Sequence, residues 1–218
     1  MPAYLRSSTP SGTRFLLWEI AEDRSFFEQT STPPAGVSNS KKIIQHLAGR
    51  YSLLALEPSF PLQDIQISAA NKPYLANHLW QFSISHCKNF AAVAISSHET
   101  VGIDVEYITP KVALIQHKFC SASETRWLNS LLPSQKLTAL TLIWSAKEAL
   151  FKWWGYGGVD FSDHLLTQPF ELKETGEIHA AFLHPLYQTN LLLRYYCWEQ
   201  MVLVIASQFL PKIEHEKN

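Results

Sequence analysis

The chain has 218 residues, of which 46% are hydrophobic and 17% charged, and its formal net charge is −1. This composition is typical of a globular protein with one large domain or two small ones, and it excludes a disordered chain. The near-neutral charge provides no general basic surface, so we expect no nucleic-acid partner.

The cysteines and the apolar runs bear on location. Cys87, Cys120 and Cys197 lie far apart, are odd in number and show no metal-ligand spacing, which predicts a reducing environment. Residues 1–10 contain no apolar run typical of a signal peptide. The longest aliphatic run, around 201–206, is too short to span a bilayer. We therefore expect a cytoplasmic protein with no membrane partner.

In the first half, patterning predicts one helix and four strands. The helix rests on apolar residues at helical spacing between Ile43 and Leu54. Segment 30–40, rich in Ser, Thr, Pro and Gly, is expected to be a loop. Asn71–Tyr74 is expected to be a turn, because the residue before a proline favours an extended backbone. Ser85–Asn89 is expected to be a loop that joins two strands. The predicted ranges are strands at 14–20, 64–67, 80–84 and 90–95 and a helix at 41–56.

The second half has the same mixture of helices and strands. Ser121 with Glu124 has the spacing of a capping box that starts a short helix. Ser134 is expected to cap a long helix that ends at Trp154, before Gly155. Strands are predicted at 101–106, 191–198 and 201–209, with a hairpin in 171–182 around Thr175–Gly176. Because the order is neither βαβα nor all-β, we favour the α+β class, with a boundary near 97–100.

Asp104 and Glu106 lie two residues apart in a predicted strand, so their side chains face the same side. Carboxylate oxygens are ligands that Mg²⁺ prefers, and substrate phosphates and waters often complete its shell. The simpler interpretation is an amphipathic strand that shows its acids to water, and this pair alone favours it.

Glu148 and Lys152 lie one turn apart in the predicted long helix and share a face. A Glu four residues before a Lys is also an ordinary surface pair. However, Trp144, Phe151 and Trp153 lie nearby, which indicates a partly covered cleft. If the fold brings the strand and the helix together, three carboxylates and a lysine could meet a cation and a phosphate.

Ser85 and His86 follow an apolar strand. A loop with free N–H groups, a hydroxyl and an imidazole could hold a phosphate. The alternative is a hairpin turn with a surface histidine. A nucleophile–base pair is a weaker third interpretation, because adjacent residues rarely reach the hydrogen bond that this role needs.

Five segments, taken in order, resemble the 4′-phosphopantetheinyl transferases, and within them the larger, surfactin-synthetase-activating (Sfp-type) group. The firm resemblance covers about residues 71 to 158, and the helix that carries Arg50 matches more loosely. Each motif is weak alone, but five in the family's order and approximate spacing are specific. The segments are Asn71–Tyr74, Phe82–His86, Val101–Glu106, Phe119 with Glu124, and Trp144–Lys152.

The resemblance implies two similar pseudo-twofold-related halves, each a helix packed on a mainly antiparallel sheet. Residues 1–100 would contact the adenine and phosphates of coenzyme A, and residues 101–218 would carry the metal-binding and catalytic groups. The implied reaction moves 4′-phosphopantetheine from coenzyme A to a serine of an apo acyl or peptidyl carrier protein. It yields the holo carrier and adenosine 3′,5′-bisphosphate, in fatty acid, polyketide or nonribosomal peptide biosynthesis. Because both halves lie in one chain, a monomer would suffice.

The resemblance also assigns roles to single residues. Asp104, Glu106 and Glu148 would hold Mg²⁺. Glu148 would also be the base for the serine hydroxyl, directly or through a metal-bound water. Lys152 would contact the phosphate and help to neutralise or protonate the leaving group. Lys72 and Pro73 would border the adenine, whereas the phosphates would be held by Ser85, His86 and Arg50.

The chain departs from the family's common pattern at several positions. Ser83 stands where Asn is frequent, Cys87 where Ser is frequent, and Tyr156 where the Gly-Lys-Gly that often follows the last motif has its Lys. Lys41 and Lys42 are only candidates for the basic residues near the first helix. Two other functions remain: a module that binds coenzyme A or a carrier without catalysis, and a Mg²⁺-dependent nuclease.

Overall fold

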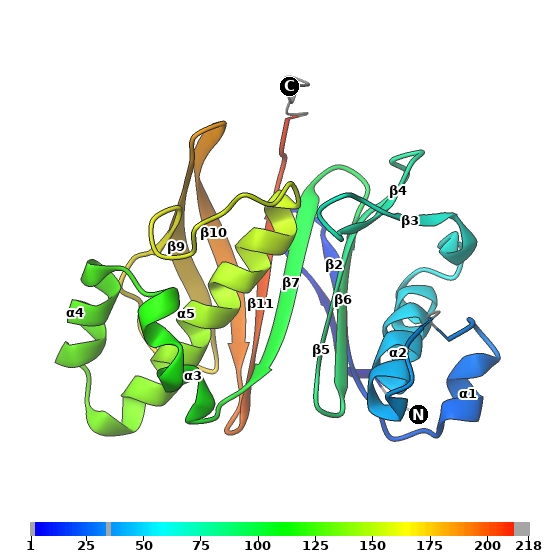
Figure 1. Cartoon of the computed structure of the whole chain (residues 1–218), viewed down its shortest axis with the longest axis horizontal. Coiled ribbons are helices and arrows are strands. Elements are labelled where there is room, and N and C mark those ends of the chain that lie inside the picture. The colour runs from blue at the N-terminus through cyan, green and yellow to red at the C-terminus, as the bar shows by residue number, and fades with distance from the viewer. Residues whose placement is uncertain (1–2, 34–35, 212–218) are drawn as a thin grey trace.

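Two antiparallel sheets lie between two groups of helices in the computed structural model, which describes residues 3–33 and 36–211 (Figure 1). The strand order is β1-β2-β6-β5 in the first sheet and β7-β11-β10-β9-β8 in the second. Helix α2 covers the outer face of the first sheet, and α5 covers that of the second. This arrangement confirms the predicted α+β class with two similar halves.

The first half consists of a four-stranded sheet, two helices and a small two-stranded sheet. Helix α2 begins after Asn39, whose side chain accepts a hydrogen bond from the Lys42 N–H. Its residues Ile43 and Leu47 are buried with sheet residues such as Val93. The elements are β1 (Ala3–Ser8), β2 (Arg14–Glu19), α1 (Arg24–Glu28), α2 (Ser40–Leu56), a 3₁₀ turn (Leu62–Asp64), β3 (Ile65–Ile67), β4 (Pro73–Leu75), β5 (Gln81–Cys87) and β6 (Phe90–Ser96).

The second half is built around the 22-residue helix α5. Gly102 lets this helix lie directly on β7, because a Cβ at Gly102 would stand 1.9 Å from the Ala149 carbonyl oxygen. The elements are β7 (Thr100–Tyr107), α3 (Lys111–Leu114), a 3₁₀ turn (Gln116–Lys118), α4 (Ala122–Ser130), α5 (Pro133–Trp154), β8 (Leu165–Thr167), β9 (Thr175–His184), β10 (Tyr187–Cys197) and β11 (Met201–Gln208).

An apolar layer fills the space between the sheets. Ile103 and Val105 of β7 are buried there with Leu17 of β2 and Ala94 of β6. Because strand residues alternate in direction, the even-numbered residues of β7 face the opposite side, toward α5. Asp104 lies on that side.

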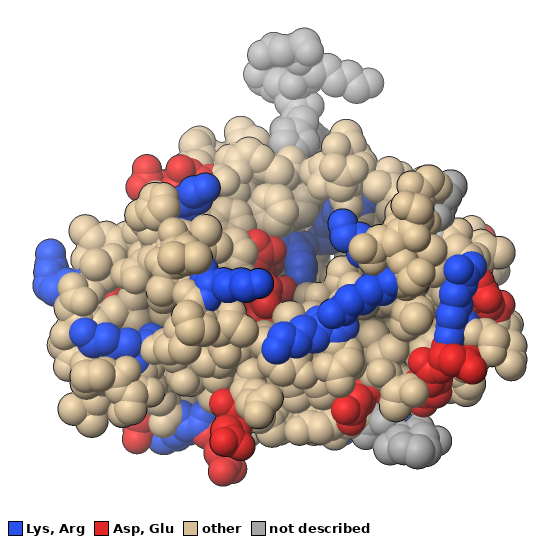
Figure 2. Space-filling model, turned by 60° about the horizontal axis from the view of Figure 1, so that its bottom comes forward, with Lys and Arg blue, Asp and Glu red and all other residues tan. Residues whose placement is uncertain are grey.

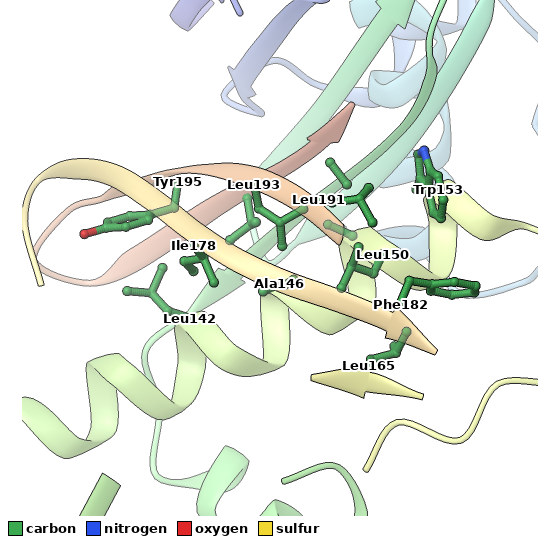
Figure 3. Packing of buried hydrophobic residues seen from close by; sticks show 14 of the residues in the cluster. Leu142, Ala146, Leu150, Trp153, Leu165, Ile178, Phe182, Leu191, Leu193 and Tyr195 are labelled. Atoms are coloured by element: carbon green, nitrogen blue, oxygen red, sulfur yellow. The ribbon is translucent and has the colours of Figure 1, made fainter. Parts of the chain in front are cut away.

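A second core fixes α5 to its own sheet, as Figure 3 shows. Leu142, Ala146 and Leu150 of the helix are buried with Ile178 of β9 and Leu193 of β10. Burial of each large apolar side chain contributes about 1.5–3 kcal/mol. The helix that carries Glu148 and Lys152 is therefore held firmly.

The two predicted helix starts in this half differ in outcome. The capping box is confirmed, since Ser121 Oγ accepts from Glu124 N at 3.3 Å and Ser121 N donates to Glu124 Oε2 at 2.8 Å. Ser134 as the cap of α5 is wrong. The cap position is Leu132, because Pro133 fits the first helical position, where its fixed φ suits the helix. The predicted end is confirmed, since Gly155 has a left-handed φ of 72°.

Three loop or turn predictions are wrong in whole or in part. In the predicted turn Asn71–Tyr74, Pro73 and Tyr74 belong to strand β4 and pair with β3. Ser85 and His86 lie within β5, in register with Ala92 and Ala91, and only Lys88 and Asn89 form the turn to β6. The hairpin around Thr175–Gly176 does not form, because both residues belong to β9. A Cβ at Gly176 would stand 2.6 Å from Tyr195 Oη, so this glycine permits a close ring contact rather than a turn.

The helices and strands that the sequence pattern did not predict are all short. Elements β1, α1, α3, β4 and β8 were not predicted, and each has six residues or fewer. Among the described residues, no helix combines the length and apolar character needed to cross a membrane.

Candidate active site

The Asp104 carboxylate is where β5, β7 and α5 meet. It is only 3% exposed. Its Oδ1 accepts hydrogen bonds from Ser85 Oγ at 2.9 Å and from Lys152 Nζ at 2.7 Å. Its Oδ2 accepts from Ser145 Oγ at 2.8 Å. A charge in this position would be costly without such partners, and here both oxygens have them.

Lys152 reaches from α5 to both strands. Besides Asp104, its Nζ donates to Ser85 Oγ at 2.9 Å and to the Ile103 carbonyl oxygen at 3.1 Å. Its side chain is 24% exposed, so one side of the stem borders solvent. Two motifs far apart in the sequence are therefore joined at one lysine.

Burial and the negative charge of Asp104 raise the pKa of both Glu148 and Glu106. Burial, followed by the charge of Asp104, raises the pKa of Glu148 to about 7, against the opposing effect of Lys152. Burial and then Asp104 also raise the pKa of Glu106. The Cys87 thiol donates to Glu106 Oε2 at 3.4 Å. The charge of Asp104 thus destabilises the charged forms of both glutamates.

This donor set suits Mg²⁺ in its chemistry, because hard carboxylate oxygens and excess negative charge are what such an ion requires. In the part of the chain that the structure describes, however, no three His, Cys, Asp or Glu side chains are already grouped as metal ligands. A shared ion would therefore require side chains around Asp104 to move.

The two members of the Ser-His motif differ in their surroundings. Ser85 is buried, and its hydroxyl also accepts a hydrogen bond from Val105 N at 3.4 Å. His86, the next residue along β5, is exposed. Partial desolvation, followed by the charges of Lys152 and Lys42, lowers the pKa of the His86 imidazole against the opposing effect of Asp104.

A basic cluster, consisting of Lys42, His46 and Arg50 of α2 with His86 of β5, lies on the first half. Arg50 Nη1 is 3.4 Å from His46 Nδ1. Burial, Arg50 and His86 lower the pKa of His46 to about 4, and burial lowers the pKa of Arg50. Patterning selected Arg50 and His86 but missed His46, although the spacing of four along a helix face is visible in the sequence. Figure 2 shows acidic and basic side chains side by side near the centre of one face.

Lys72 links the halves beside a cavity. Its Nζ donates to the Trp153 carbonyl oxygen at 3.1 Å, and burial lowers its pKa to about 8. A cavity of about 270 Å³ is lined by Lys72, Pro73, Glu148 and Lys152, among others. A second cavity of about 530 Å³ shares Lys72 and Pro73. Arg50 and His86 line neither of these two cavities.

Patterning assigned no role to Lys147, which forms a buried ion pair. Its Nζ donates to Glu124 Oε2 at 2.7 Å and to the carbonyl oxygens of Phe119 and Phe161 at 2.6 and 2.9 Å. The other oxygen of Glu124 accepts from Thr167 N at 2.8 Å. The pair joins α4, α5 and β8, so the Phe119 and Glu124 motif has a structural role here.

A comparison with protein families finds a match in the second half of the chain. Residues 100–200 match the model of the 4′-phosphopantetheinyl transferase superfamily. This segment makes up just under half of the chain, and it is similar to that superfamily. The resemblance found from the motifs is confirmed.

Three curated transferases are among the relatives that the chain matches. It is 31% identical to the 4′-phosphopantetheinyl transferase HetI of a Nostoc species over 53% of this chain and 49% of that protein. It is 34% identical to the 4′-phosphopantetheinyl transferase AcpT of Escherichia coli K12 over 49% and 55%. It is 34% identical to the 4′-phosphopantetheinyl transferase gsp of Aneurinibacillus migulanus over 35% and 32%. The chain thus spans about half the length of the first two.

Proposed function

We propose that this protein transfers 4′-phosphopantetheine from coenzyme A to a serine of an apo acyl or peptidyl carrier protein. The holo carrier and adenosine 3′,5′-bisphosphate are the products. The observation that carries the proposal is the meeting of Asp104 with Lys152, beside Glu106 and Glu148, in a chain of which residues 100–200 match this superfamily. The superfamily typically uses Mg²⁺ and coenzyme A.

In this proposal Asp104, Glu106 and Glu148 hold Mg²⁺, which when bound neutralises charge on the pyrophosphate. The carrier serine oxygen forms a bond to the phosphorus that bears the pantetheine arm, and the bond from that phosphorus to the leaving bisphosphate breaks. Glu148 would take the hydroxyl proton, directly or through a metal-bound water. The Lys152 ammonium stabilises the charge on the leaving oxygen.

The coenzyme would lie across the two halves, with residues 1–100 and 101–218 as its two walls. The cavity lined by Lys72 and Pro73 would take the adenine, since Glu148 and Lys152, which would face the pyrophosphate, line the same cavity. Ser85 and the basic cluster would hold the phosphates. The cluster adds Lys42 and His46 to Arg50 and His86, which the family resemblance already assigned to this role.

A monomer would suffice for this reaction, with no nucleic-acid or membrane partner. We also propose a cytoplasmic location, which the three free cysteines support, because disulfides are rare in reducing compartments.

The test is labelling of carrier proteins. The purified protein is incubated with a fluorescent coenzyme A analogue, Mg²⁺ and a broad panel of apo carriers, and covalent labelling is read on a gel. Labelling of at least one carrier serine is expected. No labelling across the panel, despite coenzyme binding, would favour the module without catalysis.

A variant tests the proposed base. Glu148→Gln should reduce labelling by about 10²–10⁴-fold, the usual contribution of a general base, with an unchanged circular dichroism spectrum. Glu171→Gln, at an exposed position, is the matched control and should keep full activity. Full activity in Glu148→Gln would remove this residue from the mechanism.

A further inference from the structure

The Lys152 ammonium has no hydrogen-bond donor left over. An ammonium has three N–H donors and no acceptor. All three have partners here, namely Ser85 Oγ, the Ile103 carbonyl oxygen and Asp104 Oδ1. In this arrangement the lysine cannot also donate to a coenzyme phosphate.

The oxygen that Lys152 contacts is also fully used. A carboxylate oxygen offers about two lone-pair positions, and Asp104 Oδ1 accepts from both Lys152 and Ser85. A cation bound to Oδ1 must therefore displace one of these donors. Ser85 is the harder one to displace, since it is buried and also accepts from Val105 N. Lys152 has a flexible four-carbon stem, and its charge is repelled by an incoming cation.

We propose that the metal ion and the Lys152 ammonium exchange places. The ion takes Asp104 Oδ1, and the ammonium moves from Asp104 to the coenzyme phosphate. This inference rests on the proposed function. It adds that Lys152 stays bonded to Asp104, and cannot reach the coenzyme phosphate, until a cation displaces it. Because each ligand helps to place Lys152 for the other, metal and coenzyme should strengthen each other's binding by the same factor.

The exchange predicts that one variant binds a metal ion more tightly than the natural protein. Lys152→Met removes the ammonium and keeps much of the stem. Without coenzyme, we expect it to bind Mn²⁺ about tenfold more tightly than the natural protein, because the ion no longer displaces a charge-assisted hydrogen bond. The readout is the free Mn²⁺ signal in electron paramagnetic resonance. No gain in affinity would contradict the exchange.

Lys136→Met is the matched control. It lies on the same helix and loses the same charge, about 24 Å away along the helix axis at 1.5 Å per residue. Its Mn²⁺ affinity should equal that of the natural protein. In Lys152→Met, the factor by which coenzyme A improves Mn²⁺ binding should also fall several-fold, since one route of coupling is lost.

Removing the positive charge of Lys152 raises Mn²⁺ affinity even without an exchange. A second measurement therefore tests whether the Lys152 ammonium itself becomes accessible when the metal binds. In the unaltered protein without coenzyme, saturating Mn²⁺ should raise acetylation of Lys152 several-fold, measured by mass spectrometry with an amine-reactive ester. Acetylation of Lys136 should not change.

The outcomes separate the two proposals. Mn²⁺ binding with no gain in Lys152→Met, or with no rise in Lys152 acetylation, overturns the exchange and leaves the proposed transferase intact. Failure of the natural protein to bind Mn²⁺, with or without coenzyme A, overturns the metal site and the exchange together.

Discussion

Replacing Lys147 with methionine removes a buried ammonium and keeps most of its length. The side chains of Lys147 and Glu124 are 0% and 1% exposed. The variant leaves the Glu124 carboxylate without its counter-charge and leaves two carbonyl oxygens without this donor, those of Phe119 and Phe161. Breaking one side of a buried ion pair costs about 3–5 kcal/mol. In a chain of this size, that loss lowers the melting temperature by roughly 6–20 °C.

The assay is urea unfolding followed by tryptophan fluorescence. Lys173→Met is the matched control, because Lys173 pairs with Glu171 where the side chains are 57% and 76% exposed. Such a surface pair contributes about 0–1 kcal/mol.

A double variant, Lys147→Met with Glu124→Gln, should be more stable than Lys147→Met alone, because the unpaired charge is removed while the amide oxygen can still accept from Thr167. If Lys147→Met lies within about 1 kcal/mol of the natural protein, the ion pair does not hold α4 against α5, and the reasoning fails.

Three further outcomes are expected. Chelation should abolish carrier labelling and added Mg²⁺ should restore it, whereas full labelling in excess chelator would argue against a metal. Ser145→Ala, which removes the donor to Asp104 Oδ2, should weaken Mn²⁺ binding about tenfold with an unchanged circular dichroism spectrum, and equal affinity would show that this oxygen needs no orientation. Burial, Arg50 and His86 lower the pKa of His46 from 6.5 to about 4, so the folded state binds fewer protons than the unfolded state in that window. Stability should therefore fall as pH drops from 6.5 toward 4, and His46→Gln should flatten this fall in urea titrations at pH 4.5 and 7.5; an unaltered slope would contradict the assignment.

The sequence predicted the elements that carry the site because their local signals are strong. Helix α5 ends at Trp154, and Gly155 after it is suited to the left-handed backbone there. The alternation in β7 placed Asp104 and Glu106 on one face. Short elements such as β8 were missed because three residues show no periodicity.

The contacts within the site could not be predicted from patterning. Ser85 bonds Lys152, which lies 67 residues later in the chain, and no local spacing reveals such a partner. Lys147 and Glu148 are neighbours in one helix, yet one forms a buried structural ion pair and the other lines a cavity. Burial decides between these roles, and burial depends on what packs against each face.

The apolar layer between the sheets bears on how the chain can be divided. Residues 100–200 are recognisable as a family segment, but Ile103 and Val105 are buried partly by β2 and β6, which lie outside it. The hydroxyls of Ser83 and Ser85 also accept from the Ile103 and Val105 N–H groups. Expressed alone, this segment would expose an apolar face and an unpaired strand edge, and we expect it to aggregate. The part of the chain that is easiest to recognise is therefore a poor fragment to transplant, and fusions or truncations should keep both sheets together.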